Sequence, residues 1–221
     1  MTKNIKSIPK NLEDVYEKVK SEVILLHGWW ITYRQLYGTS KERVELLNEC
    51  AGFFFYLIQN ALMDGTQLIL TKLSDPARTF GKKNMSLELI CEVVKELGED
   101  ELFSSLNESL LRYRELCSTF KKHRDKRIAH NDFETFVNET SEPLPGVSRA
   151  MVEEALKELR SFMNQVEGYY MDSEMRYEYF ITPSGGDALT EILKRGLRYE
   201  ELWRDGKIDI MDFQNSKYYK V

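Results

Sequence analysis

Apolar positions recur at helical spacing through most of the first 175 residues. Over residues 12–36 they step by three and four, which is the spacing of one face of an amphipathic helix. The same spacing predicts a long helix over residues 41–72, with a bend near Gly65, and a shorter helix over residues 87–97. Most of the chain is therefore predicted to be helical.

Polar and turn-forming residues divide the rest of the chain. Asp75-Pro76 ends the long helix, because a residue before proline avoids helical geometry, and a basic loop follows. A fourth helix is predicted over residues 99–129, and Ser148 opens a fifth that runs to Asp172. Beyond it, the patterns indicate two short strands and two short helices, at 176–182, 207–213, 187–195 and 199–205.

These elements predict an all-α fold. Residues 1–175 are expected to form an up-and-down bundle of four to five helices, and residues 176–221 a small irregular C-terminal extension packed on that bundle. The chain has 221 residues, of which 42% are hydrophobic, so it can bury a substantial core.

Composition narrows the class of protein. We expect an intracellular, cytoplasmic protein, because the N-terminus lacks a signal-peptide pattern and no apolar run is long enough to span a membrane. The three cysteines form no close pair, which favours buried thiols over disulfides. The net charge of −5 excludes a generally basic surface, so any nucleic-acid contact must be local.

The sequence contains no recognisable motif for a metal ion or for a phosphate-binding loop. None of the three histidines stands at a metal-ligand spacing, and Ser184-Gly185-Gly186 lacks the lysine of a P-loop. We therefore expect no metal site and no cofactor.

The end of the fourth helix carries the most unusual residues. Its apolar stripe runs to Phe120, and the next step of four places Arg124 on the same seam. A guanidinium facing apolar neighbours must be paired, reach solvent, or be covered by a partner or ligand. His130 follows six residues later.

Arginine and histidine together suit RNA cleavage without a metal. Histidine can transfer the proton of a ribose 2′-hydroxyl or of the leaving oxygen, and arginine's planar fork can bind the phosphoryl oxygens. His123 and His130 would lie ~10 Å apart along a helix, too far to act on one phosphorus. A mechanism that uses two histidines would need two copies of the chain around a twofold axis.

The Arg-polar-x4-His pattern at Arg124, Asp125 and His130 resembles the HEPN superfamily. The wider context, including Trp29-Trp30, Leu73-Ser-Asp75 and residues 125–132, is similar to its abortive-infection, AbiU-like branch. The resemblance implies a metal-independent endoribonuclease that acts as a homodimeric toxin or phage-defence effector, with Arg124 and His130 as its catalytic pair. Asp132 stands where related toxins carry a modified tyrosine, so that form of control is not expected.

Several nearby residues have both functional and structural interpretations. Cations in the last turn of a helix also stabilise its dipole. His123 is expected to be an exposed helical residue, His27 a core or interface residue, and the aromatics of 53–56 core and dimer contacts. The candidate substrate contacts are Asp125, Lys126, Arg127, Asn131 and His123.

Two rival functions remain open. A non-catalytic HEPN-like helical module could bind a nucleotide, RNA or a protein partner through the same cleft, and a purely structural dimer would show no salt-dependent affinity for RNA. The expected partners are RNA, a second copy of the chain, and an antitoxin or regulatory protein.

Overall fold

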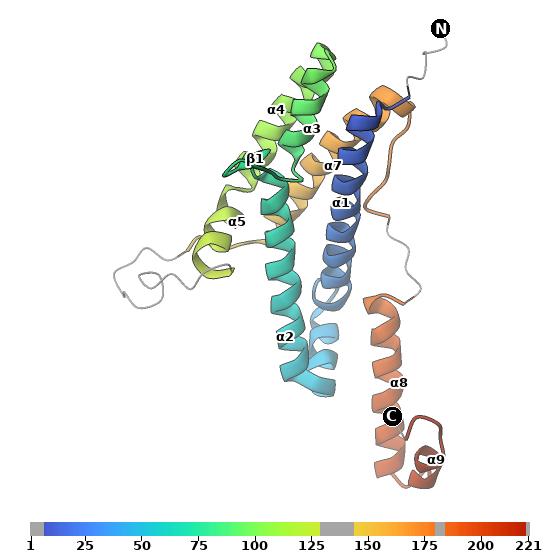
Figure 1. Ribbon diagram of the computed structural model, residues 1–221. Coiled ribbons are helices and arrows are strands. Elements are labelled where there is room, and N and C mark those ends of the chain that lie inside the picture. The colour runs from blue at the N-terminus through green and yellow to red at the C-terminus, as the bar shows by residue number, and fades with distance from the viewer. Residues whose placement is uncertain (1–6, 129–143, 180–183, 220–221) are drawn as a thin grey trace. The chain divides into compact units, whose positions relative to one another are not determined.

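The computed structural model describes residues 7–128, 144–179 and 184–219 (Figure 1). It confirms the predicted all-α fold, to which the described residues add only one short β-hairpin. The elements are α1 (Lys10–Tyr37), α2 (Lys41–Ser74), β1 (Arg78–Thr79), β2 (Lys82–Lys83), α3 (Leu87–Glu96), α4 (Asp100–Leu116), α5 (Ser118–His123), a π-helical turn η1 (Arg124–Ile128), α7 (Arg149–Met171), α8 (Gly186–Arg204) and α9 (Ile210–Gln214).

The chain forms two compact units. Unit 1 consists of Met1–Trp30 and Leu62–Phe180, and unit 2 of Ile31–Ala61 and Ile181–Val221. Helices α1 and α2 therefore contribute residues to both units. The predicted division of the sequence at residue 175 stays a prediction.

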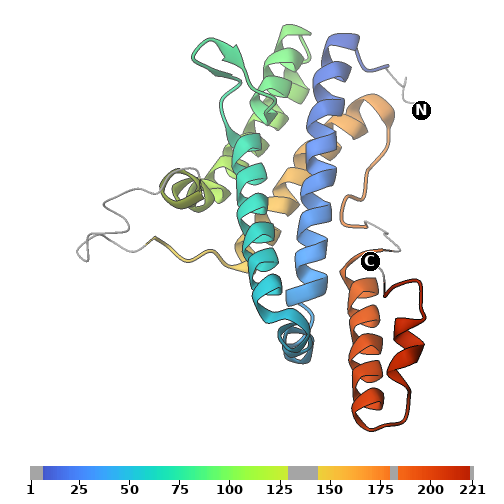
Figure 2. The ribbon, with the colours of Figure 1, turned by 60° about the horizontal axis from the view of Figure 1, so that its bottom comes forward.

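In unit 1, α4 packs against both α3 and α7 (Figure 2). Most of the apolar stripe predicted for α1 is in the core: Val19, Val23 and Leu26 are fully buried, whereas Val15 is half-buried and Tyr16 takes its place. A buried polar contact joins α1 to α7, because the Tyr16 hydroxyl donates to Glu167 at 2.8 Å and Lys20 pairs with the same carboxylate at 2.8 Å. Because α7 also packs against α4, these contacts link α1 to the helix pair that precedes Arg124.

The long second helix is present, but its bend is not at Gly65. The backbone leaves helical geometry at Ala51, with φ −164° and ψ 66°. Gly65 instead lies where α2 passes close to α1, since a Cβ added there would lie 1.8 Å from Cζ3 of Trp29. The glycine is required for close packing rather than for a bend.

We expect Gly65→Ala to destabilise the protein by about 1–3 kcal/mol, because the indole must move to accommodate the methyl group. This is the net loss, because a Cβ only 1.8 Å from a ring carbon puts the steric cost at the upper end for overpacking, and alanine's higher helix propensity offsets only roughly 1 kcal/mol of it. Gly168→Ala is the matched control, since an added Cβ there has only one neighbouring atom, 4.0 Å away. Urea unfolding followed by circular dichroism measures both, and a Gly65→Ala protein as stable as the wild type would contradict the packing argument.

The helix predicted over residues 99–129 is divided into three parts. Cys117 separates α4 from α5, although the amide of Lys121 still donates to the Cys117 carbonyl at 2.9 Å. The last described turn, Arg124–Ile128, is π-helical. Wider turns of this kind are rare and often occur at functional sites.

The basic loop after α2 forms a tight hairpin. Strands β1 and β2 pair antiparallel, and the turn residues Phe80 and Gly81 both have positive φ, 49° and 79°. This is the backbone geometry of a type I′ turn, which matches the twist of two paired strands. The sequence signal was weak because phenylalanine rarely occupies such a position.

The C-terminal predictions were partly wrong. Helix α8 is continuous through Gly196, where two short helices were predicted, and residues 207–213 are not a strand, because α9 begins at Ile210. Residues 176–179 form a turn, closed by a hydrogen bond from the Tyr179 amide to the Arg176 carbonyl, and residues 180–182 of that predicted strand lie outside the described residues. In unit 2, Arg43 forms an ion pair with Asp187 at the start of α8.

The three cysteines are free thiols, and two of them, Cys91 and Cys117, are buried as predicted, whereas Cys50 is half-buried. No helix of the described residues has the length and apolar character needed to cross a bilayer.

Candidate active site around Arg124

Arg124 is held by two carboxylates. Its Nη1 donates to both oxygens of Asp75, each at 3.0 Å, and its Nε donates to Asp125 at 2.8 Å. The side chain is only 16% exposed. The guanidinium on the apolar seam is therefore paired, which is one of the outcomes that its sequence position required.

The two carboxylates bind only Nε and Nη1 of the guanidinium. Nη2 of Arg124 makes no hydrogen bond with any described residue, so its two N–H groups can bind an oxyanion. Burial by itself would lower the pKa of Arg124, but the hydrogen bonds to Asp125 and Asp75 outweigh it and raise the pKa above its ordinary value. The group stays cationic at every physiological pH.

Asp75 is itself fixed by its surroundings at the end of α2. The Tyr113 hydroxyl donates to the Leu70 carbonyl at 2.9 Å, and Arg114 Nε donates to the Ser74 carbonyl at 3.0 Å. These contacts tie α4 to the last turns of α2. Asp75 therefore directly follows a helix end that two hydrogen bonds tie to α4.

The other cations of the predicted basic cluster differ in their surroundings. Lys121 Nζ lies 3.8 Å from Asp75, and Arg127 pairs with Asp64 at 2.6 Å. Lys122 and Lys126 are exposed and form no ion pair with a described residue. Asp125 is exposed and bonds to Arg124, so it helps to orient the guanidinium.

The prediction for His123 was wrong. Instead of an exposed helical residue, the structure places a ring that is 8% exposed, with Nε2 at 2.6 Å from the carbonyl oxygen of Pro145. Nε2–H must donate this bond, because a carbonyl can only accept. His123 therefore links the end of α5 to the segment before α7 and is not available to RNA.

His27 is a satisfied core histidine, as predicted. Its ring is 2% exposed, Nδ1 lies 2.9 Å from the Val23 carbonyl, and Nη1 of Arg160 lies 3.4 Å from Nε2. An arginine only donates, so the proton is on Nδ1. Burial lowers the pKa of His27, with the charge of Arg160 adding to that effect, and the ring is not placed for acid–base chemistry.

His130 and Asn131 lie outside the described residues. Both of the other histidines have structural roles.

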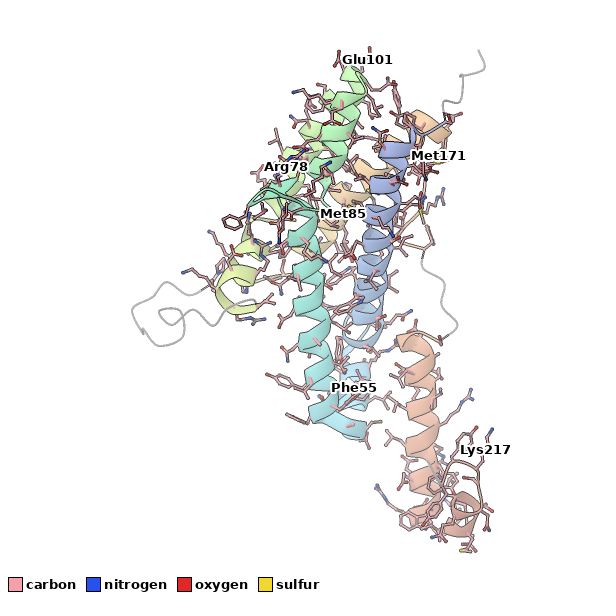
Figure 3. All side chains as sticks on the ribbon, in the orientation of Figure 1. Phe55, Arg78, Met85, Glu101, Met171 and Lys217 are labelled. Carbon is pink, nitrogen blue, oxygen red and sulfur yellow. The ribbon has the colours of Figure 1, made fainter. Side chains whose placement is uncertain are left out.

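A groove of about 460 Å³ lies beside Asp75, the partner of Arg124. Asp75 forms part of its wall, together with the exposed Met85, which Figure 3 labels. Its charged lining consists of Lys18, Lys72, Lys83, Glu22 and Asp75. Three ammonium groups against two carboxylates give the groove a positive balance, which suits a phosphodiester chain.

The aromatic residues of α2 are mostly at the surface. Phe55 is buried, whereas Phe53, Phe54 and Tyr56 are 76%, 55% and 60% exposed. The expectation of core contacts therefore holds for one of the four, and the other three form an exposed aromatic surface in unit 2.

The family comparison covers most of the chain. Residues 9–190 match the family model described as AbiU2, of the HEPN group. The chain belongs to the AbiU2 family of HEPN proteins. The match confirms the resemblance seen in the sequence and includes every residue of the site described above. Searches of curated proteins and of solved structures gave no significant match.

The sequence did not identify two parts of this AbiU2 site. Asp75 was recognised as a helix end and as part of the family resemblance, but not as the partner of Arg124, which lies 49 positions away. The groove lysines come from separate segments, α1, α2 and β2, and no local pattern connects them. The sequence feature that could have pointed to Asp75 is its position: it is an acidic residue immediately before the proline that ends a helix.

Proposed function

We propose that this AbiU2 protein is a metal-independent endoribonuclease that acts in the cytoplasm as a toxin or phage-defence effector. Arg124 and His130 are the proposed catalytic residues, and Lys126, Arg127 and Asn131 the proposed substrate contacts, with Asp125 as an orienting residue. The family match supports an abortive-infection role.

The observation that carries the proposal is the state of Arg124. Two carboxylates fix its guanidinium while Nη2 stays free of described partners. A preorganised cation in a part-buried site stabilises charge that develops on a phosphoryl group and costs little reorganisation during the reaction.

The proposed reaction is an internal transfer of the phosphoryl group. The ribose 2′-oxygen attacks the adjacent phosphorus, the bond to the 5′-oxygen of the next nucleotide breaks, and the products are a 2′,3′-cyclic phosphate and a 5′-hydroxyl. His130 takes the 2′-hydroxyl proton or gives one to the leaving oxygen. Arg124 Nη2 binds a non-bridging oxygen as negative charge increases there.

We further propose a homodimer in which two copies of the site face a shared cleft, controlled by an antitoxin or regulatory protein. The exposed rings of Phe53, Phe54 and Tyr56 support self-association, because several large apolar side chains exposed within one helical turn favour an interface. Sedimentation equilibrium of the full chain tests this part, and a monomer at micromolar concentration would contradict it.

The test of the activity uses the wild-type chain with a 5′-labelled single-stranded RNA in excess EDTA. We expect cleavage that chelation does not reduce, with fragments that end in a 2′,3′-cyclic phosphate and a 5′-hydroxyl. The end groups are read by phosphatase and polynucleotide kinase treatment. RNA that binds but stays intact would favour the non-catalytic alternative, and cleavage that depends on Mg²⁺ would overturn the mechanism.

A further inference from the structure

The last two helices line a second, half-open cavity, unrelated to Arg124. It measures about 590 Å³ and lies between α8, α9 and the segment after α9. All of its lining residues fall between 196 and 219, beyond the residues 9–190 that match the family. Its aromatic lining consists of Tyr199, Trp203, Phe213, Tyr218 and Tyr219.

The rings are arranged as walls that meet at angles. Phe213 and Tyr219 stand at 90° with centroids 5.8 Å apart, and Tyr199 and Phe213 at 53° with centroids 6.4 Å apart. Two rings can hold a flat nucleobase between them only where their faces are parallel, which is not the arrangement of these two pairs. Rings that meet at an angle instead surround a compact head group, as in the aromatic cages that bind quaternary ammonium ions.

Charge in the cavity points to the same class of ligand. Glu200 and Asp212 line it, and neither carboxylate forms an ion pair or hydrogen bond with a described residue. Two unpaired carboxylates would repel a phosphate and attract a cation.

The chain itself contains a related contact. Lys217, labelled in Figure 3, places its ammonium 5.0 Å from the ring centroid of Tyr218, one of the lining residues. The aromatic surface of this region therefore already accommodates one cation.

Two hydroxyl groups beside the aromatic rings are available for hydrogen bonds to a ligand. The side-chain oxygens of Tyr199 and Ser216 are buried and make no hydrogen bond with a described residue. Both residues line the cavity. Buried hydroxyls without a partner are costly, and a ligand that brings a donor or acceptor of its own can satisfy them.

We propose that this cavity binds an organic ammonium group, with the aromatic rings against its methyl or methylene groups and Glu200 and Asp212 balancing its charge. The site is independent of the proposed ribonuclease activity. The ammonium could belong to a free small molecule or to a methylated lysine of a partner protein, and the two sources share the same recognition chemistry.

The experiment is a calorimetric titration of the full chain with choline and, separately, with its neutral isostere 3,3-dimethyl-1-butanol. We expect choline to bind at least about tenfold more tightly, because only the cation gains from ring faces and carboxylates. Equal binding of the two compounds would show an apolar pocket without preference for a cation and would overturn the proposal. Absence of choline binding would also overturn it.

Variants locate the binding. Glu200→Gln and Asp212→Asn keep the shape of the cavity and should each weaken choline binding several-fold, and Trp203→Ala should weaken it more. Glu201→Gln is the matched control, because Glu201 pairs with Arg198 and does not line the cavity. Weakening by Glu201→Gln equal to that by Glu200→Gln would contradict the site.

A peptide that carries trimethyllysine distinguishes the two sources. Binding tighter than that of choline would assign the ammonium to a protein partner, and binding weaker than that of choline to a free small molecule. Unchanged RNA cleavage in the Glu200→Gln and Asp212→Asn variants would separate this site from the ribonuclease proposal.

Discussion

Arg124→Ala is expected to lower RNA cleavage by about 10²–10³-fold, since it removes a preorganised donor to the developing charge. His130→Ala is expected to lower it by about 10²–10⁴-fold through loss of the proton transfer. Arg124→Lys should recover little, because the donors of an ammonium all lie on one nitrogen and cannot reproduce the planar fork that bonds to Asp75 and Asp125 on one side and reaches phosphate on the other. Single-turnover cleavage rates with saturating enzyme measure the chemical step in each variant.

The control for these variants is Arg112→Ala. Arg112 also pairs with a carboxylate, Glu158 at 3.1 Å, and is on α4 outside the site. Its removal should change the cleavage rate by less than about twofold, since exposed ion pairs contribute little. If Arg124→Ala cleaved as fast as Arg112→Ala, with both proteins folded by circular dichroism, the assignment of Arg124 would fail.

Local patterns were enough for the helices whose ends are marked by capping or breaking residues. Ser148 accepts a hydrogen bond from the Met151 amide, so α7 begins where the sequence indicated. Gly98, with φ 74°, follows α3 as a left-handed terminator, and Asp75-Pro76 follows α2. In each case one residue determines the boundary through its own backbone chemistry.

Where the outcome depended on a distant neighbour, the sequence failed. Gly65 looked like a weak point of α2, but Trp29 on α1 decides its role. His123 was expected to be exposed, yet its ring is buried and donates to the carbonyl of Pro145, 22 positions away. Near the C-terminus, the Asp209 side chain caps α9 by accepting a hydrogen bond from the Met211 amide. This helix start was missed because apolar and polar residues alternate around Ile208 and Ile210, which is the pattern of a strand.

For the site, the sequence identified Arg124 as a candidate functional residue but did not identify the residue that binds it. The apolar stripe through Phe120 singled out Arg124 as a guanidinium that needed a partner, and the structure supplies that partner as Asp75. The stripe can be recognised from neighbouring residues alone, because it follows from the spacing within one helix. The partner depends on α4 and α5 packing against the end of α2, and no spacing within one helix encodes that contact.

The Asp75–Arg124 pair leads to a second large expected effect. Asp75→Asn keeps the shape of the side chain but removes the charge that holds Nη1, so Arg124 should sample other rotamers. We expect cleavage to fall by roughly 10–100-fold, the usual effect of a catalytic group displaced by about 1 Å. RNA affinity should not fall in parallel, because the variant removes a negative charge near the groove. Cleavage rates and filter-binding affinities measured on the same RNA separate the two effects.

A double-mutant cycle distinguishes positioning from damage to the fold. If Asp75 acts through Arg124, then Asp75→Asn combined with Arg124→Ala should cleave no more slowly than Arg124→Ala alone, because nothing is left to orient. Independent structural damage would multiply the two losses and would contradict the positioning role. The reference cycle uses Arg112→Ala and Glu158→Gln, a second acid–arginine pair that joins α4 to α7, and neither single nor double variant should alter the rate beyond about twofold.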